Sequence, residues 1–220
     1  MTGVDLWWAD VRRERPGPGD RAALSAGERT KAAAFRFGAD RHRYEVAHVL
    51  LRRVLAERVG AAPAELSFGR DPCPTCGRPG GRPTLPGSGL HFSLTHAGDL
   101  VGVAVAAVPV GVDVEGPLRN CPCPLAANMH PADRDRVTPL PEPERHAETL
   151  RWWARVESLL KCRGEGIGHG LDAYAVLGPG PDRTGLAGGC GIVSLPALLG
   201  YEAAVATRDA VPAVTVRRPW

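Results

Sequence analysis

The sequence lacks a long hydrophobic run and an N-terminal targeting signal. A membrane-spanning helix needs about 20 consecutive apolar residues, and the longest candidate, Leu100 to Val112, is shorter and better explained by strands. The first residues carry no basic region ahead of an apolar core, as a secretory signal would. We therefore expect a cytoplasmic protein with no membrane partner.

The sequence also has little excess of charge of either sign. Its net charge is +3 over 220 residues, whereas nucleic-acid-binding domains usually carry a clear basic excess. Nucleic acid is therefore not expected as a partner, although a local basic patch facing an anionic ligand is compatible with this charge. The hydrophobic content of 44% is that of an ordinary globular protein and is sufficient for a sizeable core.

Apolar residues recur at strand and helix spacings along the chain. A capping box at Ser25 and Glu28 predicts a helix, and Asp40 is positioned to cap the next one. A longer helix is expected over 146–163, with Gly164 as its stop. Strands are expected at 4–8, 65–68, 90–95, 100–108, 109–114, 171–177, 191–195, 201–207 and 213–216, and irregular segments at 71–89 and 117–145. Because strands and helices do not alternate regularly, the expected class is α+β with antiparallel sheets.

Two carboxylates share one face of the strand Val110-Gly-Val-Asp-Val-Glu-Gly. Strand side chains alternate between faces, so Asp113 and Glu115 lie on the same side, roughly 7 Å apart along the strand. Adjacent like charges repel, so the pair is tolerable if a cation lies between them or if both face water. Oxygen ligands of this kind suit magnesium. A strand face with two hydrated acids is the alternative.

A third carboxylate lies on the expected helix 146–163. Glu157 and Lys161 are four residues apart, so they project from the same side of the helix. One interpretation is a surface ion pair, which would contribute little. The other is a third metal ligand beside a lysine that reaches a phosphate.

The end of the strand 90–95 supplies a polar face. Ser93 and Thr95 lie on it, His96 follows, and the turn at Gly98 leaves backbone amides free. A hydroxyl, an imidazole and free N–H groups together are able to hold a pyrophosphate. Alone, a Thr-His pair before a turn is usually structural.

Three motifs thus stand in order: Ser93-Leu-Thr-His-Ala-Gly, Gly111-Val-Asp-Val-Glu and Trp153-Ala-Arg-Val-Glu-Ser-Leu-Leu-Lys161. With them the chain resembles the Sfp-type 4′-phosphopantetheinyl transferases over residues 24–207. Their signatures are (N/S)-x-S-H-S-G, G-(I/V)-D-(I/V)-E and W-x-x-K-E-(A/S)-x-x-K. The chain departs from the pattern at four positions, which are Glu28 and Val156 in place of lysines, Thr95 in place of serine, and Ala97 in place of a second serine.

The resemblance implies two pseudo-symmetric α+β subdomains, each an antiparallel sheet packed on a long helix, with coenzyme A between them. Residues 1–108 are expected to form the N-terminal subdomain, on the adenine and 3′-phosphate side of coenzyme A. Residues 109–220 are expected to form the C-terminal subdomain, with the metal site and catalysis.

The resemblance also implies the site residues. Asp113, Glu115 and Glu157 are expected to bind magnesium, with manganese as an alternative. Three residues are expected to be catalytic: Glu157, or a water that it orients, as the base, Lys161 to neutralise developing charge, and His96 to fix the phosphates. The residues expected to contact coenzyme A are Lys31, Arg36, Arg43, Arg82, Thr95, His96 and Lys161. For each arginine singly, a hydrated surface charge is the alternative.

The implied activity is that of a holo-[acyl-carrier-protein] synthase, which transfers 4′-phosphopantetheine from coenzyme A to a carrier-protein serine and releases 3′,5′-ADP. The expected partner is an acyl or peptidyl carrier protein, for polyketide or nonribosomal peptide synthesis. Segment 117–145 is expected to contribute to carrier choice, and a monomer is expected.

Two other functions compete with this one. A different magnesium-dependent phosphoryl-transfer enzyme or phosphohydrolase could use the same carboxylates, but would leave the Thr-His strand without a reason. A non-catalytic module around a zinc loop is the second, because Cys73-Pro-Thr-Cys76 is half of a zinc knuckle that Cys121 and Cys123 could complete. In a reducing cytoplasm, free thiols are the simpler interpretation.

Overall fold

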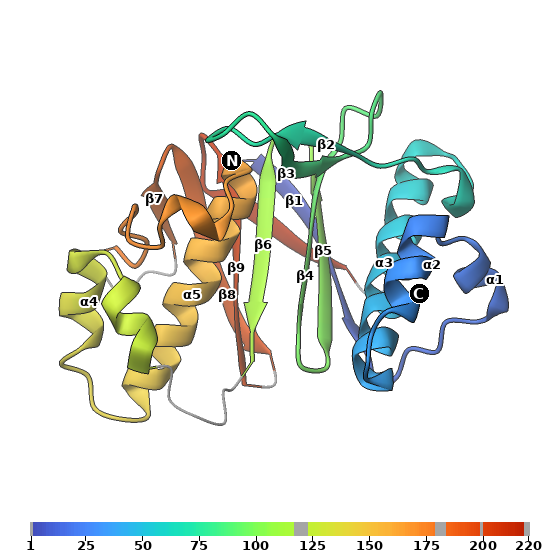
Figure 1. Cartoon of the computed structure of the whole chain (residues 1–220). Coiled ribbons are helices and arrows are strands. Elements are labelled where there is room, and N and C mark those ends of the chain that lie inside the picture. The colour runs from blue at the N-terminus through green and yellow to red at the C-terminus, as the bar shows by residue number, and fades with distance from the viewer. Residues whose placement is uncertain (1, 117–122, 179–183, 199, 218–220) are drawn as a thin grey trace.

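The structure is a computed structural model that describes residues 2–116, 123–178, 184–198 and 200–217. Within that part, one side of the molecule is a four-stranded sheet in the order β10-β1-β5-β4, covered by helices (Figure 1). Its elements are β1 (Thr2–Asp10), α1 (Pro18–Ala22), α2 (Ala26–Ala33), α3 (Gly38–Val59), β4 (His91–Ala97), β5 (Leu100–Ala106) and β10 (Pro212–Arg217). The apolar face of α3, which includes Val54 and Leu55, packs on this sheet against Val101 and Val103.

The other side repeats this arrangement of sheet and long helix. A second sheet, ordered β6-β9-β8-β7 in the described part, packs against α5 through a core that contains Trp152, Leu159 and Ile192. The elements here are β6 (Val110–Glu115), α4 (Pro131–Val137), α5 (Glu144–Arg163), β7 (Thr184–Ala187), β8 (Cys190–Leu198) and β9 (Tyr201–Arg208). Helix α5 ends where Gly164 takes a left-handed conformation, with φ of 77°.

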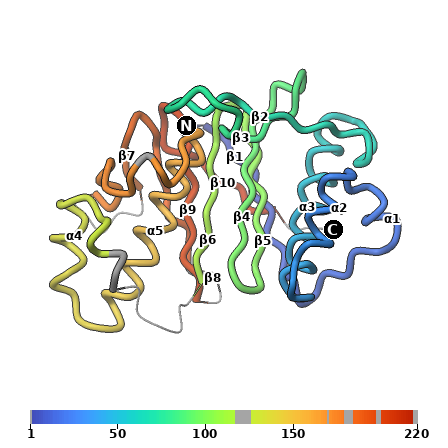
Figure 2. The backbone as a smooth tube through the Cα atoms, in the orientation of Figure 1, coloured from blue at the N-terminus to red at the C-terminus, as the bar shows by residue number. Residues whose placement is uncertain are grey.

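The two sheets pack their inner faces together around Leu6, Val112 and Val205, each fully buried. At one edge β4 and β6 lie side by side (Figure 2). The amide of Val112 donates to the Ser93 hydroxyl, and the amide of Val114 to the Thr95 hydroxyl, each at 3.1 Å. These hydroxyls replace the carbonyls of a strand partner, so they join the sheets and fix the register of β6 against β4.

A short hairpin, β2 (Gly69–Pro72) and β3 (Pro79–Thr84), lies across one end of the sheets and links the two sides (Figure 2). On β3, the Arg82 guanidinium donates to the carbonyl of Cys162 at the end of α5, at 2.9 Å. Short 3₁₀ helices occur at Pro63–Glu65, Cys123–Asn128 and Ile167–His169. Of the described helices, none combines the length and apolarity that crossing a membrane requires.

Most predicted elements are confirmed. The mixed α+β class with antiparallel sheets is observed, as are the helices at the Ser25 capping box and before Gly164. The strands predicted at 4–8, 90–95, 100–108, 109–114, 191–195, 201–207 and 213–216 are also present. One difference is the β1–β10 pair, which is parallel. β10 enters the first sheet from the far end of the chain, so no hairpin dictates an antiparallel partner.

Several predictions about local structure were wrong. No strand forms at 65–68, and the segments predicted to be irregular contain β2, β3 and α4. Asp40 lies in the first turn of α3 rather than at its cap, which is Phe37. The predicted strand 171–177 is absent because side chains bind its backbone: Asp133 accepts from the amides of Val176 and Leu177, at 2.8 and 3.1 Å.

The N-terminus of α2 carries the first testable prediction. The Ser25 hydroxyl accepts from the amide of Glu28 at 3.2 Å, and the Glu28 carboxylate accepts from the amide of Ser25 at 2.7 Å. We expect Ser25→Ala to lower the free energy of unfolding by about 1 kcal/mol, measured by urea denaturation. Ser25→Thr keeps the oxygen and is expected to keep most of the stability. Equal loss in both variants would contradict the capping role.

Candidate active site

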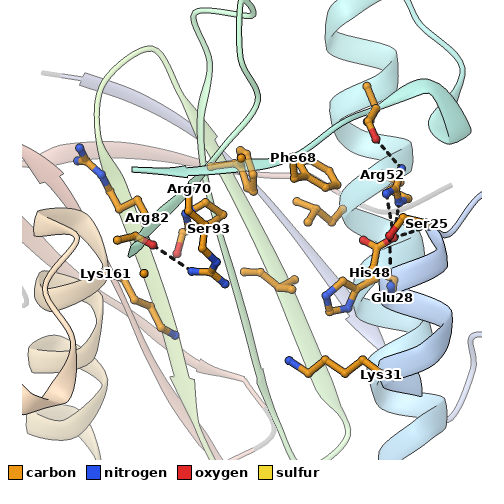
Figure 3. A pocket seen from close by; sticks show the side chains of 18 of the residues that line it. Ser25, Glu28, Lys31, His48, Arg52, Phe68, Arg70, Arg82, Ser93 and Lys161 are labelled. Carbon is orange, nitrogen blue, oxygen red and sulfur yellow. Dashed lines mark hydrogen bonds and ion pairs between the residues drawn. The ribbon is translucent and has the colours of Figure 1, made fainter. Parts of the chain in front are cut away.

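A cavity of about 980 Å³ opens between the two sides of the molecule. Its walls come from α2 and α3, from the β2–β3 hairpin, from β4, and from the end of α5 with the loop after it (Figure 3). Lys31 on α2 and Lys161 on α5 enter from opposite walls. The volume is at the upper end of the usual range for small-molecule sites, so an extended ligand fits.

The wall formed by α2 and α3 combines aromatic rings with a cation. The rings of Tyr44 and His48 are stacked, with centroids 3.8 Å apart, and Phe35 lies 5.4 Å from Tyr44. The Lys31 ammonium lies 5.5 Å from the centre of the Tyr44 ring. Burial lowers the pKa of His48, and its Nδ1 is 2.9 Å from the Tyr44 carbonyl. This wall suits a flat ring that carries negative charge nearby.

Glu28 lies on the same wall but is not available to a ligand. Its carboxylate pairs with Arg52 at 2.8 Å, and the Arg52 side chain is 2% exposed. Arg52 also donates to the carbonyls of Pro63 and Leu66, at 2.7 and 3.1 Å. A buried guanidinium needs such partners, so Glu28 has a structural role here.

The predicted coenzyme A residues separate into two groups. Lys31, His96 and Lys161 line the cavity together. Arg82 lines it as well, but its guanidinium is engaged by the Cys162 carbonyl and by Asp71 at 3.1 Å.

The other three predicted residues lie outside the cavity lining. The Thr95 hydroxyl is turned toward β6, where it donates to Asp113 at 3.0 Å. Arg36 is exposed and lies over the Phe37 ring. Arg43 donates to the Gly98 carbonyl at 2.6 Å, on the turn that follows His96.

Asp113 is the centre of a buried polar cluster. It is 4% exposed, and Lys161 donates to its Oδ1 at 2.6 Å and to the Val112 carbonyl at 3.2 Å. Burial raises the pKa of Asp113, against the opposing effects of Lys161 and Thr95. Gly111, two residues earlier on the same strand face, lets α5 approach closely enough for the Lys161 contact.

Two further carboxylates lie close to Asp113. Burial, followed by the charges of Asp113 and Glu157, raises the pKa of Glu115 to about 7, although a hydrogen bond from Trp153 opposes the shift. Burial and the charge of Asp113 also raise the pKa of Glu157. Carboxylates close to one another repel when they are charged, so a positive charge nearby would stabilise them.

Oxygen ligands and this excess of negative charge fit a hard divalent cation. The Oδ2 atom of Asp113 is buried and has no hydrogen-bond partner among the described residues. In the same part of the chain, no three His, Cys, Asp or Glu side chains converge closely enough to enclose a metal by themselves. Magnesium is the cation expected here, and it commonly takes further ligands from water and substrate phosphates. The ligand assignment stays a prediction.

The zinc site at the cysteine loop also stays a prediction. Cys73 and Cys76 lie between β2 and β3 as free thiols, and backbone hydrogen bonds from Cys76 and Thr75 lower the pKa of Cys73. Cys121 and the side chain of Cys123, their predicted partners in a zinc site, lie outside the described residues.

Sequence reasoning missed the wall formed by Tyr44, His48 and Arg52, whose positions follow from the packing of α2 on α3. It also missed a compositional signal. Lys31 and Lys161 are the two lysines of a chain whose Lys and Arg together number 27, and both face the cavity. A lysine in a chain that otherwise uses arginine indicates a position that needs a compact ammonium group.

Comparison with known proteins gives one family. The chain is 28% identical over 173 residues to a 4′-phosphopantetheinyl transferase of Bacillus subtilis, covering 76% of this chain and 74% of that protein. It is 31% identical over 186 residues to a phosphopantetheinyl transferase of a Thraustochytrium species, covering 76% and 63%. It is 24% identical over 157 residues to the 4′-phosphopantetheinyl transferase Sfp of Bacillus subtilis, covering 70% and 66%. No protein-family model matches the chain. The chain thus carries the three motifs in order and is similar to Sfp and to other 4′-phosphopantetheinyl transferases over about 70% of its length.

Proposed function

We propose that the protein transfers 4′-phosphopantetheine from coenzyme A to a serine of an acyl or peptidyl carrier protein, with magnesium, and releases 3′,5′-ADP. One observation carries the proposal: a single cavity has a lysine on each of two opposite walls, and one of those lysines contacts the buried Asp113. Coenzyme A carries a 3′-phosphate beside its adenine and a pyrophosphate farther along. A ligand with two separate anionic groups matches such a cavity.

The residues of the chain take up distinct parts of this substrate. Lys31 and the stacked Tyr44 and His48 are suited to the adenine and 3′-phosphate end. His96 and Lys161 are suited to the pyrophosphate, because both line the cavity and Lys161 also contacts Asp113. The division into subdomains 1–108 and 109–220, related by pseudo-symmetry, is part of the proposal, with β10 returning to the first sheet.

The chemistry at phosphorus is an in-line attack by the carrier serine. Asp113, Glu115 and Glu157 would hold magnesium, which when bound supplies charge neutralisation at the pyrophosphate. Glu157 accepts the serine proton, directly or through a water that it orients. Lys161 stabilises charge on the bridging oxygen as 3′,5′-ADP departs, and His96 holds the phosphates in place.

The direct test is to incubate the protein with coenzyme A, magnesium and an apo carrier protein, and to measure the carrier by mass spectrometry. A gain of one phosphopantetheine arm supports the proposal. Release of phosphate from coenzyme A without carrier labelling would favour a phosphohydrolase instead. Binding of zinc without either reaction would favour the non-catalytic module.

The carrier partner rests on chemistry as well as on resemblance. Carrier domains are typically small acidic helical bundles, and the net charge of +3 here suits such a partner. We propose that segment 117–145 contributes to carrier choice, although 117–122 lie outside the described residues. Polyketide or nonribosomal peptide synthesis is the proposed setting, the cytoplasm the proposed location, and a monomer the proposed active form.

Lys31 carries a second testable prediction. If its ammonium binds a phosphate of coenzyme A, Lys31→Ala is expected to raise the KM for coenzyme A about tenfold, the effect of losing one charge-assisted hydrogen bond. Turnover at saturating coenzyme A is expected to change little, because the contact exists before and during transfer. Steady-state carrier labelling over a range of coenzyme A concentrations measures both. A fall in turnover at unchanged KM would place Lys31 at the reacting centre instead.

A further inference from the structure

Thr95 is buried at the junction of the two sheets, and the one proton of its hydroxyl is already donated. The residue is 4% exposed. Its hydroxyl donates to Oδ1 of Asp113 at 3.0 Å and accepts from the amide of Val114 at 3.1 Å. A hydroxyl has a single proton to donate, so Thr95 has none left for a ligand in the cavity. Its chemistry is therefore directed at Asp113.

The two oxygens of Asp113 have opposite surroundings. Oδ1 receives hydrogen bonds from Thr95 and from Lys161, the latter at 2.6 Å. Oδ2 is buried and has no hydrogen-bond partner in the described part of the chain. Two donors on one oxygen fix the plane of the carboxylate, so the orientation of the free oxygen is set by the protein before any ligand arrives.

We propose that Thr95 is a positioning residue for a divalent cation, which it serves by holding Oδ1 of Asp113 so that Oδ2 is the ligand atom. The inference rests on the proposed function, because the metal belongs to that reaction. The role assigned to Thr95 thereby changes from contacting coenzyme A to positioning a metal ligand. Because Thr95 is β-branched, its χ1 angle is restricted, which keeps the hydroxyl aimed at Asp113.

The neighbouring Ser93 supplies a matched control. Its hydroxyl accepts from the amide of Val112 at 3.1 Å, the same kind of bridge between β4 and β6 that Thr95 makes one pleat farther along. Ser93 is also buried, at 5% exposure, but its bond is to the backbone and not to Asp113. Ser93→Ala thus removes a bridge alone, whereas Thr95→Val removes a bridge and the Asp113 contact.

The test is a titration of Mn²⁺ into the full chain, followed by the electron paramagnetic resonance signal of free Mn²⁺, with and without coenzyme A. We expect Thr95→Val to weaken Mn²⁺ binding about tenfold, the usual cost of losing a partner of a metal ligand. Thr95→Ser keeps the donor and is expected to bind nearly as tightly as the wild type. Ser93→Ala is expected to retain Mn²⁺ affinity while losing thermal stability comparable to that lost by Thr95→Val.

Several outcomes would overturn the inference. These are unchanged Mn²⁺ affinity in Thr95→Val, an equal loss in Ser93→Ala, or absence of Mn²⁺ binding by the wild type. Weaker coenzyme A binding by Thr95→Val in metal-free buffer would return Thr95 to the coenzyme A residues. If Thr95→Val does not fold, Thr95→Cys, whose thiol is a weak donor, is compared with Thr95→Ser, and equal affinities overturn the inference. Carrier labelling by the wild type tests the proposed function separately.

Discussion

Replacing Glu157 with glutamine is expected to abolish carrier labelling, with a fall in turnover of roughly 10²–10⁴-fold, the usual contribution of a general base. The amide keeps the size of the side chain but neither accepts the serine proton nor carries the charge that a cation requires. The fold is expected to persist, because Glu157 is only partly buried and is repelled by the charge of Asp113. The rate of mass gain by an apo carrier protein is the measurement, with circular dichroism to establish folding.

Glu144 provides the control for this variant. It lies on the same helix, in the first turn of α5, and is exposed. Glu144→Gln makes the same chemical change far along the helix from Lys161 and is expected to leave labelling near the wild-type rate. Wild-type labelling by Glu157→Gln would remove Glu157 from both of its proposed roles.

Replacing Gly111 with alanine is expected to lower the free energy of unfolding more than Ser25→Ala does. A β-carbon at this position would overlap the carbonyl oxygen of Ser158 and lie 2.5 Å from the amide nitrogen of Cys162. Both atoms belong to the backbone of α5, which cannot move aside as the end of a flexible side chain could. Forced overpacking of this kind costs about 1–3 kcal/mol, occasionally more, and each kcal/mol lowers the Tm of a domain of this size by about 2–4 °C.

Gly111→Ala is also expected to lower activity, because moving β6 away from α5 separates Asp113 from Lys161. Thermal unfolding and carrier labelling of the same preparation measure the two effects. Gly3→Ala is the matched control, since Gly3 also lies on a strand and its added β-carbon would meet no atom within 4 Å. It is expected to change the free energy of unfolding by less than about 0.5 kcal/mol. An equal Tm for the two variants would contradict the close approach of α5.

Sequence patterns predicted the elements whose buried face carries regularly spaced apolar residues. Helix α5 and strands β4 and β6 have such faces, and their apolar spacing revealed them. The hairpin β2–β3 was missed because its strands are rich in glycine, proline and charged residues, so no apolar alternation marks it. The segment 171–177 has the composition of a strand, but Asp133 on α4 supplies the partner for its amides. When a side chain, rather than a neighbouring strand, accepts the backbone hydrogen bonds, the sequence shows no periodicity that reveals it.

The sequence predicted only some contacts of the candidate site. Asp113, Glu157 and Lys161 were proposed because local spacing on a strand and a helix determines the side from which they project, and Lys161 does contact Asp113. Spacing along the chain does not say what a side chain will contact. Arg82 was expected to hold a phosphate, yet the Cys162 carbonyl engages its guanidinium. Thr95 was expected at the ligand, yet its hydroxyl bonds to Asp113. Both contacts cross between the two sides of the molecule.

The parallel pairing of β10 with β1 has a consequence for synthesis on the ribosome. Thr2 pairs with Pro212 and Trp7 with Arg217, so β1 waits for a strand that is translated much later. Until 212–217 emerge, β1 has an unpaired edge, and an exposed edge beside apolar side chains such as Val4 and Leu6 invites association with other chains. The first sheet is therefore completed only after β10 has been translated. A fast-translated or overproduced chain is at greatest risk of aggregation in that interval.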